Sequence, residues 1–120
     1  MNDIVPIKID FSSDLNNYKS LLKNKIENSN VLVIGGAGTI GSSYIKNILI
    51  FKPSKLIVVD TNENGLTELT RDLRSSNFLD YKPFYITYPV NLLSDTFDKI
   101  FNLFKWDVVA NFSAHKHVRS

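Results

Sequence analysis

Short runs of consecutive apolar residues alternate along the chain with longer segments in which apolar residues recur every three or four positions. A continuous apolar run is typical of a strand that is buried on both faces, whereas the longer spacing is typical of an amphipathic helix. Strands that alternate with helices of about a dozen residues indicate βαβ units and a parallel sheet in an α/β fold. The predicted strands are Val31–Ile34, Lys55–Asp60, Phe84–Tyr88 and Asp107–Phe112.

Three predicted helices connect these strands, and each carries an apolar stripe. Pro53 should end the first helix. Thr61 or Asn62 should cap the second helix, and Ser94 the third. We interpret the stripes as core positions, including the phenylalanines of the third helix, rather than as a binding groove. The stripes are Ile40, Tyr44, Ile45, Ile48 and Leu49, then Leu66, Leu69 and Leu73, then Phe97, Ile100, Phe101 and Phe104.

The order of the strands in the sheet follows from the handedness of parallel crossovers, which is almost always right-handed. The strand at residue 31 should lie between those at 55 and 107, with the strand at 84 outermost. This is the 3-2-1-4 half of a Rossmann-type parallel sheet with flanking helices. We expect residues 30–120 to form this half-domain and residues 1–29 to form an N-terminal extension, with a short extended segment and a helix.

The stretch GGAGTIG connects the first predicted strand to the helix that follows. Gly35 would allow a tight turn, Gly38 would let the backbone approach a pyrophosphate, and Gly41 would let the helix pack closely on the sheet. The anion would then bind at the free N–H groups and positive end of the helix N-terminus. The pattern therefore predicts dinucleotide binding, with a glycine-rich turn that binds no ligand as the alternative.

Asp60 ends the second predicted strand, where an acidic residue would accept hydrogen bonds from ribose hydroxyls. Its charge would repel a 2′-phosphate, so the sequence favours NAD over NADP. Asn62 could add a contact to ribose or adenine. The alternatives are a helix cap or solvated strand end for Asp60, and a turn or cap residue for Asn62.

Composition excludes several other classes of function. The net charge of +2 is too small to indicate a nucleic acid or an anionic membrane surface as partner. The chain has no cysteine, no run near the roughly 20 apolar residues of a membrane span, and no signal-peptide pattern at its start, so we expect a cytoplasmic protein. His115 and His117 lack a third ligand in sequence reach, and we expect no metal site.

Three segments together carry a resemblance to a known family: VLVIGGAGTIG, KLIVVDTNENGLTELTRDLRSS and DVVANFSAHKHVRS. In this order they resemble the extended short-chain dehydrogenase/reductase superfamily. Within it, they are similar to the polysaccharide-biosynthesis (CapD-like) branch of nucleotide-sugar 4,6-dehydratases and epimerases. The likeness covers residues 31–120, and the terminal Ser-Ala-x-Lys-His-Val segment narrows it to this branch.

The resemblance implies an enzyme that acts on a UDP-sugar for surface polysaccharide synthesis. In such enzymes NAD(P) accepts hydride from the sugar C4, water leaves across C5–C6, and hydride returns to C6. The glycine loop would line the pyrophosphate, Asp60 would hold the adenosine ribose, and the chain after the fourth strand would follow the cofactor. The predicted cofactor-binding residues are Gly35, Gly38, Thr39, Ile40, Gly41, Asp60, Asn62, Ser113, Ala114 and Lys116.

The sequence also departs from the family pattern. Ile34 stands where the family usually has threonine, and TYPVN at residues 87–91 lacks the usual adenine-contacting aspartate, so adenine recognition would be altered. None of the five tyrosines has a lysine four positions later, so no catalytic Y-x-x-x-K is present.

The missing motif leaves three interpretations. We expect the catalytic residues to lie beyond the chain, which would then be a truncated, inactive cofactor-binding part. The alternative is a stand-alone, non-catalytic NAD-binding module that completes its sheet as a homodimer. A weaker alternative is a structural remnant, for which the missing adenine-contacting aspartate is the only indication.

Overall fold

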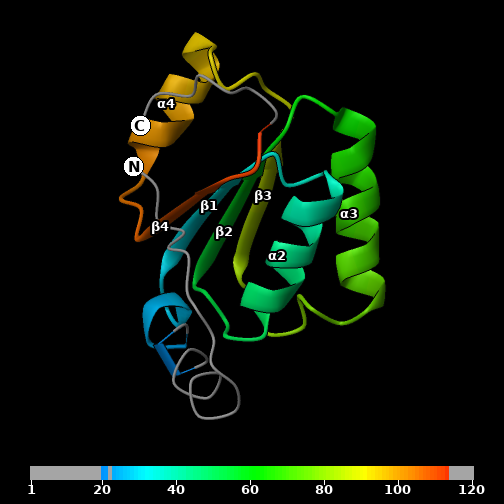
Figure 1. Ribbon diagram of the computed structural model, residues 1–120, viewed down its shortest axis with the longest axis vertical. Helices are drawn as coiled ribbons and strands as arrows, with labels where there is room; N and C mark the ends of the chain where they lie inside the picture. Colours follow the sequence, from blue (N-terminus) through cyan, green and yellow to red (C-terminus); the bar gives the residue numbers. More distant parts are fainter. Residues whose placement is uncertain (1–19, 22, 114–120) are drawn as a thin grey trace, which may run out of the picture.

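The computed structural model of the protein describes residues 20–21 and 23–113 (Figure 1). Its strands and helices follow the predicted order, and four of the eight strand ends differ from the prediction by one residue each. The predicted extended segment at residues 4–9 lies outside the described residues. The elements are β1 (Asn30–Ile34), α2 (Thr39–Leu49), β2 (Lys55–Val59), α3 (Glu63–Ser75), β3 (Phe84–Tyr88), α4 (Asp95–Leu103) and β4 (Val108–Asn111).

The four strands form one parallel sheet in the order β3-β2-β1-β4. Leu32 in the centre pairs with Ile57 of β2 on one side and with Val109 of β4 on the other. This order confirms the predicted 3-2-1-4 arrangement and the Rossmann-type α/β class. All carboxyl ends of the strands therefore lie at the same edge of the sheet.

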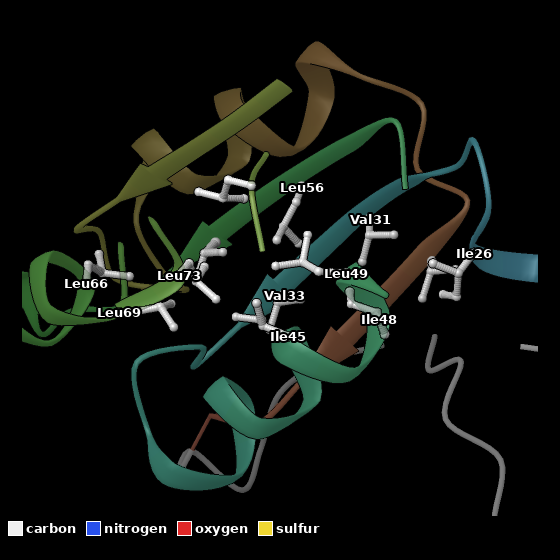
Figure 2. Packing of buried hydrophobic residues seen from close by; sticks show 13 residues of the cluster. Ile26, Val31, Val33, Ile45, Ile48, Leu49, Leu56, Leu66, Leu69 and Leu73 are labelled. Carbon is white, nitrogen blue, oxygen red and sulfur yellow. The ribbon is translucent and has the colours of Figure 1, made fainter. Parts of the chain in front are cut away.

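The first core layer lies between the sheet and the helices α2 and α3 (Figure 1). Val31 and Val33 of β1 point into it, and Figure 2 shows them beside Ile45 and Ile48 of α2. Ile26, in the helical turn before β1, joins the same cluster and is 1% exposed. The N-terminal extension therefore contacts the domain core at this residue.

The second core layer lies on the opposite face, under α4. Here the alternate residues of the central strands, such as Leu32 and Ile57, meet Phe97 and Ile100. Since both faces of β1 and β2 are covered, these strands need apolar residues at every position, which explains their continuous apolar runs.

The prediction of a core position is wrong for two residues, Phe101 and Ile40, whose side chains are exposed. Phe101 of α4 is 40% exposed, because α4 ends at Leu103 and Phe101 lies at the margin of the layer, where its ring contacts those of Phe97 and Trp106. Ile40 is 70% exposed, since it lies in the first turn of α2, next to the glycine loop and above the strand ends. Helical spacing alone does not reveal where a helix extends past the sheet.

Candidate functional site

A cleft of about 290 Å³ lies at the carboxyl edge of the sheet. Residues at the ends of all four strands, or in the loops that follow them, surround it. In open parallel sheets, ligands bind outside these strand ends. The cleft is lined by Ile34, Gly35, Gly38, Val59, Asp60, Thr61, Val90, Asn91, Leu92, Phe112 and Ser113.

Three glycines of the loop are required by the protein's own packing. Gly35 has a φ of +78°, and a Cβ on it would lie 2.7 Å from the carbonyl carbon of Phe112, so the predicted tight turn is confirmed. A Cβ on Gly41 would meet the backbone oxygen of Gly35, which confirms close packing of α2 on the strand end. Gly36, which the sequence interpretation passed over, has no room because the side chains of Val58 and Ile45 occupy the space.

Gly38 differs from the other glycines of this loop. Its backbone, with φ of −76° and ψ of 172°, suits any residue. Among the described residues, only the Gly35 oxygen lies within 4 Å of a Cβ built there, at 3.7 Å. The part of the chain that the structure describes therefore has room for a side chain at this position. Gly38 also precedes α2 without a side-chain cap, which leaves N–H groups of the first turn open to an anion.

Asp60 follows β2 and accepts two backbone hydrogen bonds. Its Oδ2 accepts from the N–H of Ala37 in the glycine loop, and its Oδ1 accepts from the N–H of Asn62, each at 2.9 Å. A carboxylate has about four acceptor positions, so each oxygen keeps capacity for a further donor. The side chain thus lies in the cleft wall where the sequence places a ribose-binding acid.

Asn62 is the N-cap of α3. Its Oδ1 accepts from the N–H of Gly65 at 2.9 Å, which decides the predicted cap in favour of Asn62 over Thr61. Thr61 instead lines the cleft, although it was proposed only as a cap. A contact between Asn62 and a cofactor stays a prediction.

The end of β4 forms the opposite wall of the cleft. The N–H of Phe112 donates to the oxygen of Ile34 at 2.7 Å, and the N–H of Ser113 donates to Oδ1 of Asn111 at 2.8 Å. Ser113 lines the cleft, and its contact with a cofactor stays a prediction. Ala114 and Lys116, the remaining predicted contacts, lie outside the described residues, as do His115 and His117.

An apolar side of the cleft comes from the loop after β3, where Val90 and Leu92 lie with Asn91 between them. The Asn91 side chain is fixed, because its Oδ1 accepts from the N–H of Leu93 at 2.8 Å. Sequence reasoning noted this segment only for its missing acid. The signal that could have placed it in the site is topological, since the residues after every parallel strand reach the same edge.

A second hollow, of about 490 Å³, lies between α2 and α3, and Ala37 of the glycine loop contributes to its lining. The charges around it are paired within the protein. Arg71 donates to Glu68 at 2.8 Å, and Lys46 lies 2.5 Å from Oδ2 of Asp72. The hydrogen bond and charge of Lys46 lower the pKa of the Asp72 carboxyl. The smaller cleft is therefore the candidate site, since only there do the glycine loop and Asp60 meet.

Within residues 20–21 and 23–113, no three histidine, cysteine or acidic side chains approach one another closely enough to hold a metal ion. No helix in the same residues is long and apolar enough to cross a bilayer.

A solved structure resembles this chain only weakly. The crystal structure of E. coli MccB with ATP is similar over 88% of this chain and 38% of that one, with 13% identity and a TM-score of 0.49. The fold assignment rests on the strand order of the sheet.

Comparison with known sequences identifies relatives. The capsular polysaccharide biosynthesis protein CapD of Staphylococcus aureus is 27% identical over 106 residues, which cover 82% of this chain. The probable polysaccharide biosynthesis protein EpsC of Bacillus subtilis is 32% identical over 102 residues. The uncharacterized membrane protein MJ1061 of Methanocaldococcus jannaschii is 39% identical over 54 residues.

In each case the match spans 16% of the relative's length. The family model described as "Polysaccharide biosynthesis protein" matches residues 31–120, which begin at β1 and include the glycine loop and Asp60. The chain therefore belongs to this CapD-like family of polysaccharide biosynthesis proteins, as the resemblance in its sequence indicates.

Proposed function

We propose that the cleft at the carboxyl edge of the sheet binds a dinucleotide, NAD in preference to NADP. We further propose that the chain is the cofactor-binding part of a nucleotide-sugar 4,6-dehydratase or epimerase for surface polysaccharide synthesis. The first proposal concerns residues of the described structure. The second concerns a whole protein, of which relatives are about six times longer than the matched region.

Gly38 is the observation that carries the dinucleotide proposal. Gly35, Gly36 and Gly41 are explained by contacts within the protein, whereas a side chain at Gly38 would meet almost nothing among the described residues. A glycine that the fold does not need is expected where a ligand approaches the backbone closely. The position, before an uncapped helix N-terminus, suits a pyrophosphate.

The other contacts follow from this placement. The pyrophosphate would lie against the first turn of α2, at Thr39 and Ile40. Asp60 would use its remaining acceptor capacity for the adenosine ribose hydroxyls, and its charge would oppose a 2′-phosphate. Val90 and Leu92 would offer the base an apolar surface. Ser113 would lie toward the nicotinamide half, while Ala114 and Lys116, the other predicted contacts, lie outside the described residues.

Family membership supports the wider proposal, because the names of the CapD and EpsC relatives refer to polysaccharide synthesis. When bound, NAD would supply a reversible hydride acceptor for chemistry on the sugar. The residues of this chain would bind and orient NAD and would favour it over NADP. The acid and base groups would come from outside this chain, since its sequence contains no Y-x-x-x-K.

The decisive experiment compares NAD binding by the chain and by its Gly38→Ala variant in calorimetry. We expect the methyl group to weaken NAD binding about tenfold or more, because it would occupy the space of the pyrophosphate. The free energy of unfolding should change by less than about 1 kcal/mol, because the backbone and the space around residue 38 accept alanine.

NADP serves as the matched ligand, and it should bind the unaltered chain about tenfold more weakly than NAD, by repulsion from Asp60. An unaltered chain that binds no NAD at millimolar concentration, or a Gly38→Ala variant that binds NAD equally well, contradicts the dinucleotide proposal.

A further inference from the structure

The Asp60 carboxylate links two segments that are distant in sequence. One is the glycine loop, through the Ala37 N–H, and the other is the turn into α3, through the Asn62 N–H. Ala37 and Asp60 are 23 residues apart. Both bonds pair a charged acceptor with a backbone donor, which is roughly twice as strong as a neutral pair. Neither bond involves a ligand.

A second contact joins the same two segments. A Cβ placed on Gly65, in the first turn of α3, would lie 2.9 Å from the Cβ of Ala37 and 2.8 Å from Nδ2 of Asn62. The loop thus packs directly on this turn, and Asn62 caps the turn by accepting from Gly65. Ala37, Asp60, Asn62 and Gly65 form one interlocked group, which we call the loop clamp.

We propose that Asp60 is a positioning residue for the glycine loop: through the loop clamp, its carboxylate fixes the loop conformation in the free protein, before any ligand arrives. This role is additional to a ribose contact. Its consequence for ligand binding rests on the proposed function, because a preformed loop loses less conformational freedom when an anion binds. The role itself concerns the protein alone.

Asparagine cannot reproduce the loop clamp. Its amide has one oxygen and one NH₂ group, so one of the two backbone N–H groups would face another donor. Asp60→Asn retains size and shape but removes one acceptor. Asp80→Asn is a matched control with the same chemical change, because Asp80 lies exposed in the turn before β3.

The test is amide hydrogen exchange of the free chain, followed residue by residue by NMR. In Asp60→Asn, at least one of the two amides, that of Ala37 or that of Asn62, should exchange about tenfold faster or more, as expected when a bond to a charged acceptor is lost. The amides of β3 and α4 should not change, and Asp80→Asn should leave Ala37 as it is. Unchanged exchange at both Ala37 and Asn62 in Asp60→Asn overturns the proposal.

A second measurement needs no variant, in case Asp60→Asn does not fold. A scalar coupling across the hydrogen bond should connect the Ala37 nitrogen to the Asp60 carboxyl carbon in the unaltered chain. The Gly35 N–H to Val59 oxygen bond, at 2.7 Å, is the internal positive control. Coupling at Gly35 without coupling at Ala37 overturns the proposal.

These readouts also separate the two proposals. A chain that shows the loop clamp but binds no NAD contradicts the proposed function alone. A chain that binds NAD but lacks both the coupling and the exchange effect contradicts the positioning role alone.

Discussion

An aspartate at each edge of the sheet accepts a backbone hydrogen bond. At one edge the donor is the first residue of β1, and at the other it is a residue of the loop that follows β1. At the amino edge, Oδ2 of Asp107 accepts from the N–H of Asn30 at 2.7 Å. At the carboxyl edge, Oδ2 of Asp60 accepts from the N–H of Ala37 at 2.9 Å. The residue type and the kind of bond are the same, but their surroundings differ.

At the amino edge, the polar and charged groups bind one another. The Asn30 N–H donates to the Asp107 carboxylate, and the Asp107 N–H donates to the Asn30 backbone oxygen. The side-chain amide of Asn30 also donates to the backbone oxygen of Lys105, at 2.8 Å. The Lys55 ammonium lies 5.0 Å from the ring centre of Phe84 and 5.6 Å from that of Phe104, in a cation–π arrangement. The hydrogen bonds and cation–π contacts of this edge thus join residues of the protein to one another.

The carboxyl edge is arranged around open space. Asp60 lines a cleft and joins the glycine loop to the turn before α3, and α2 begins there without a side-chain cap. In a parallel sheet, each following helix begins at this edge, so its unpaired N–H groups point toward the same side. Position in the topology, rather than residue type, therefore distinguishes a candidate binding acid from a structural one.

The largest effect that tests this comparison is expected from Gly41→Ala at the carboxyl edge. The new methyl group would meet the Gly35 oxygen and lie 2.9 Å from the Gly36 Cα, and backbone atoms cannot move aside easily. We expect a loss of about 1–3 kcal/mol in the free energy of unfolding, measured in urea, together with weaker NAD binding. If Gly41→Ala is as stable as Gly38→Ala, our account of the loop's packing is wrong.

A smaller effect is expected from Asp107→Ala at the amino edge. This change leaves the Asn30 N–H without its charged acceptor and should lower the free energy of unfolding by about 1–2 kcal/mol. NAD affinity, measured by calorimetry, should stay the same, because the cleft lies at the other edge. A clear loss of affinity in folded Asp107→Ala would show that the two edges are not independent.

The smallest effect concerns pH and Tyr81, whose hydroxyl donates to the Pro53 oxygen at 2.8 Å near the amino edge. Burial raises the pKa of Tyr81 from 10.0 to about 12. The unfolded chain therefore ionises first, so this tyrosine's contribution to stability is full below pH 10 and is lost as pH rises toward 12. Unfolding followed by circular dichroism across this range measures the loss.

At neutral pH, Tyr81→Phe should lower the free energy of unfolding by about 0.5–1 kcal/mol relative to the unaltered chain, because the hydrogen bond to the Pro53 oxygen is lost. It should then lose less stability than the unaltered chain as the solution becomes alkaline. Part of the alkaline loss should remain, since burial also raises the pKa of Tyr85. An identical alkaline loss in both chains would assign the effect to other groups.

Much of the fold could be predicted from the sequence because local signals and tertiary structure agree. The runs VLVI and LIVV are buried on both faces, and the caps Asn62 and Ser94 make the predicted hydrogen bonds. Gly35 and Gly41 are also predictable, since a turn and a close helix approach leave a recognisable spacing.

The remaining features depend on contacts between distant segments. Gly36 is required by the side chains of Val58 and Ile45, which no local pattern connects to it. Val90 and Leu92 enter the cleft because β3 ends at the same edge as β1. Phe101 follows the helical period yet is 40% exposed, and its ring contacts those of Phe97 and Trp106. Periodicity predicts which face of a helix is apolar, but not which residues of that face are covered.

The place of β1 in the sheet has a consequence for how the chain folds. β1 pairs with β2 through a local βαβ unit, but its other side pairs with β4, with Val31 opposite Val108. That separation of 77 residues makes the second pairing entropically costly and slow compared with the first. On a ribosome adding about 5–20 residues per second, β1 would wait about 4–15 s for this partner. The glycine loop and Asp60 can thus meet before the wall formed by β4 exists.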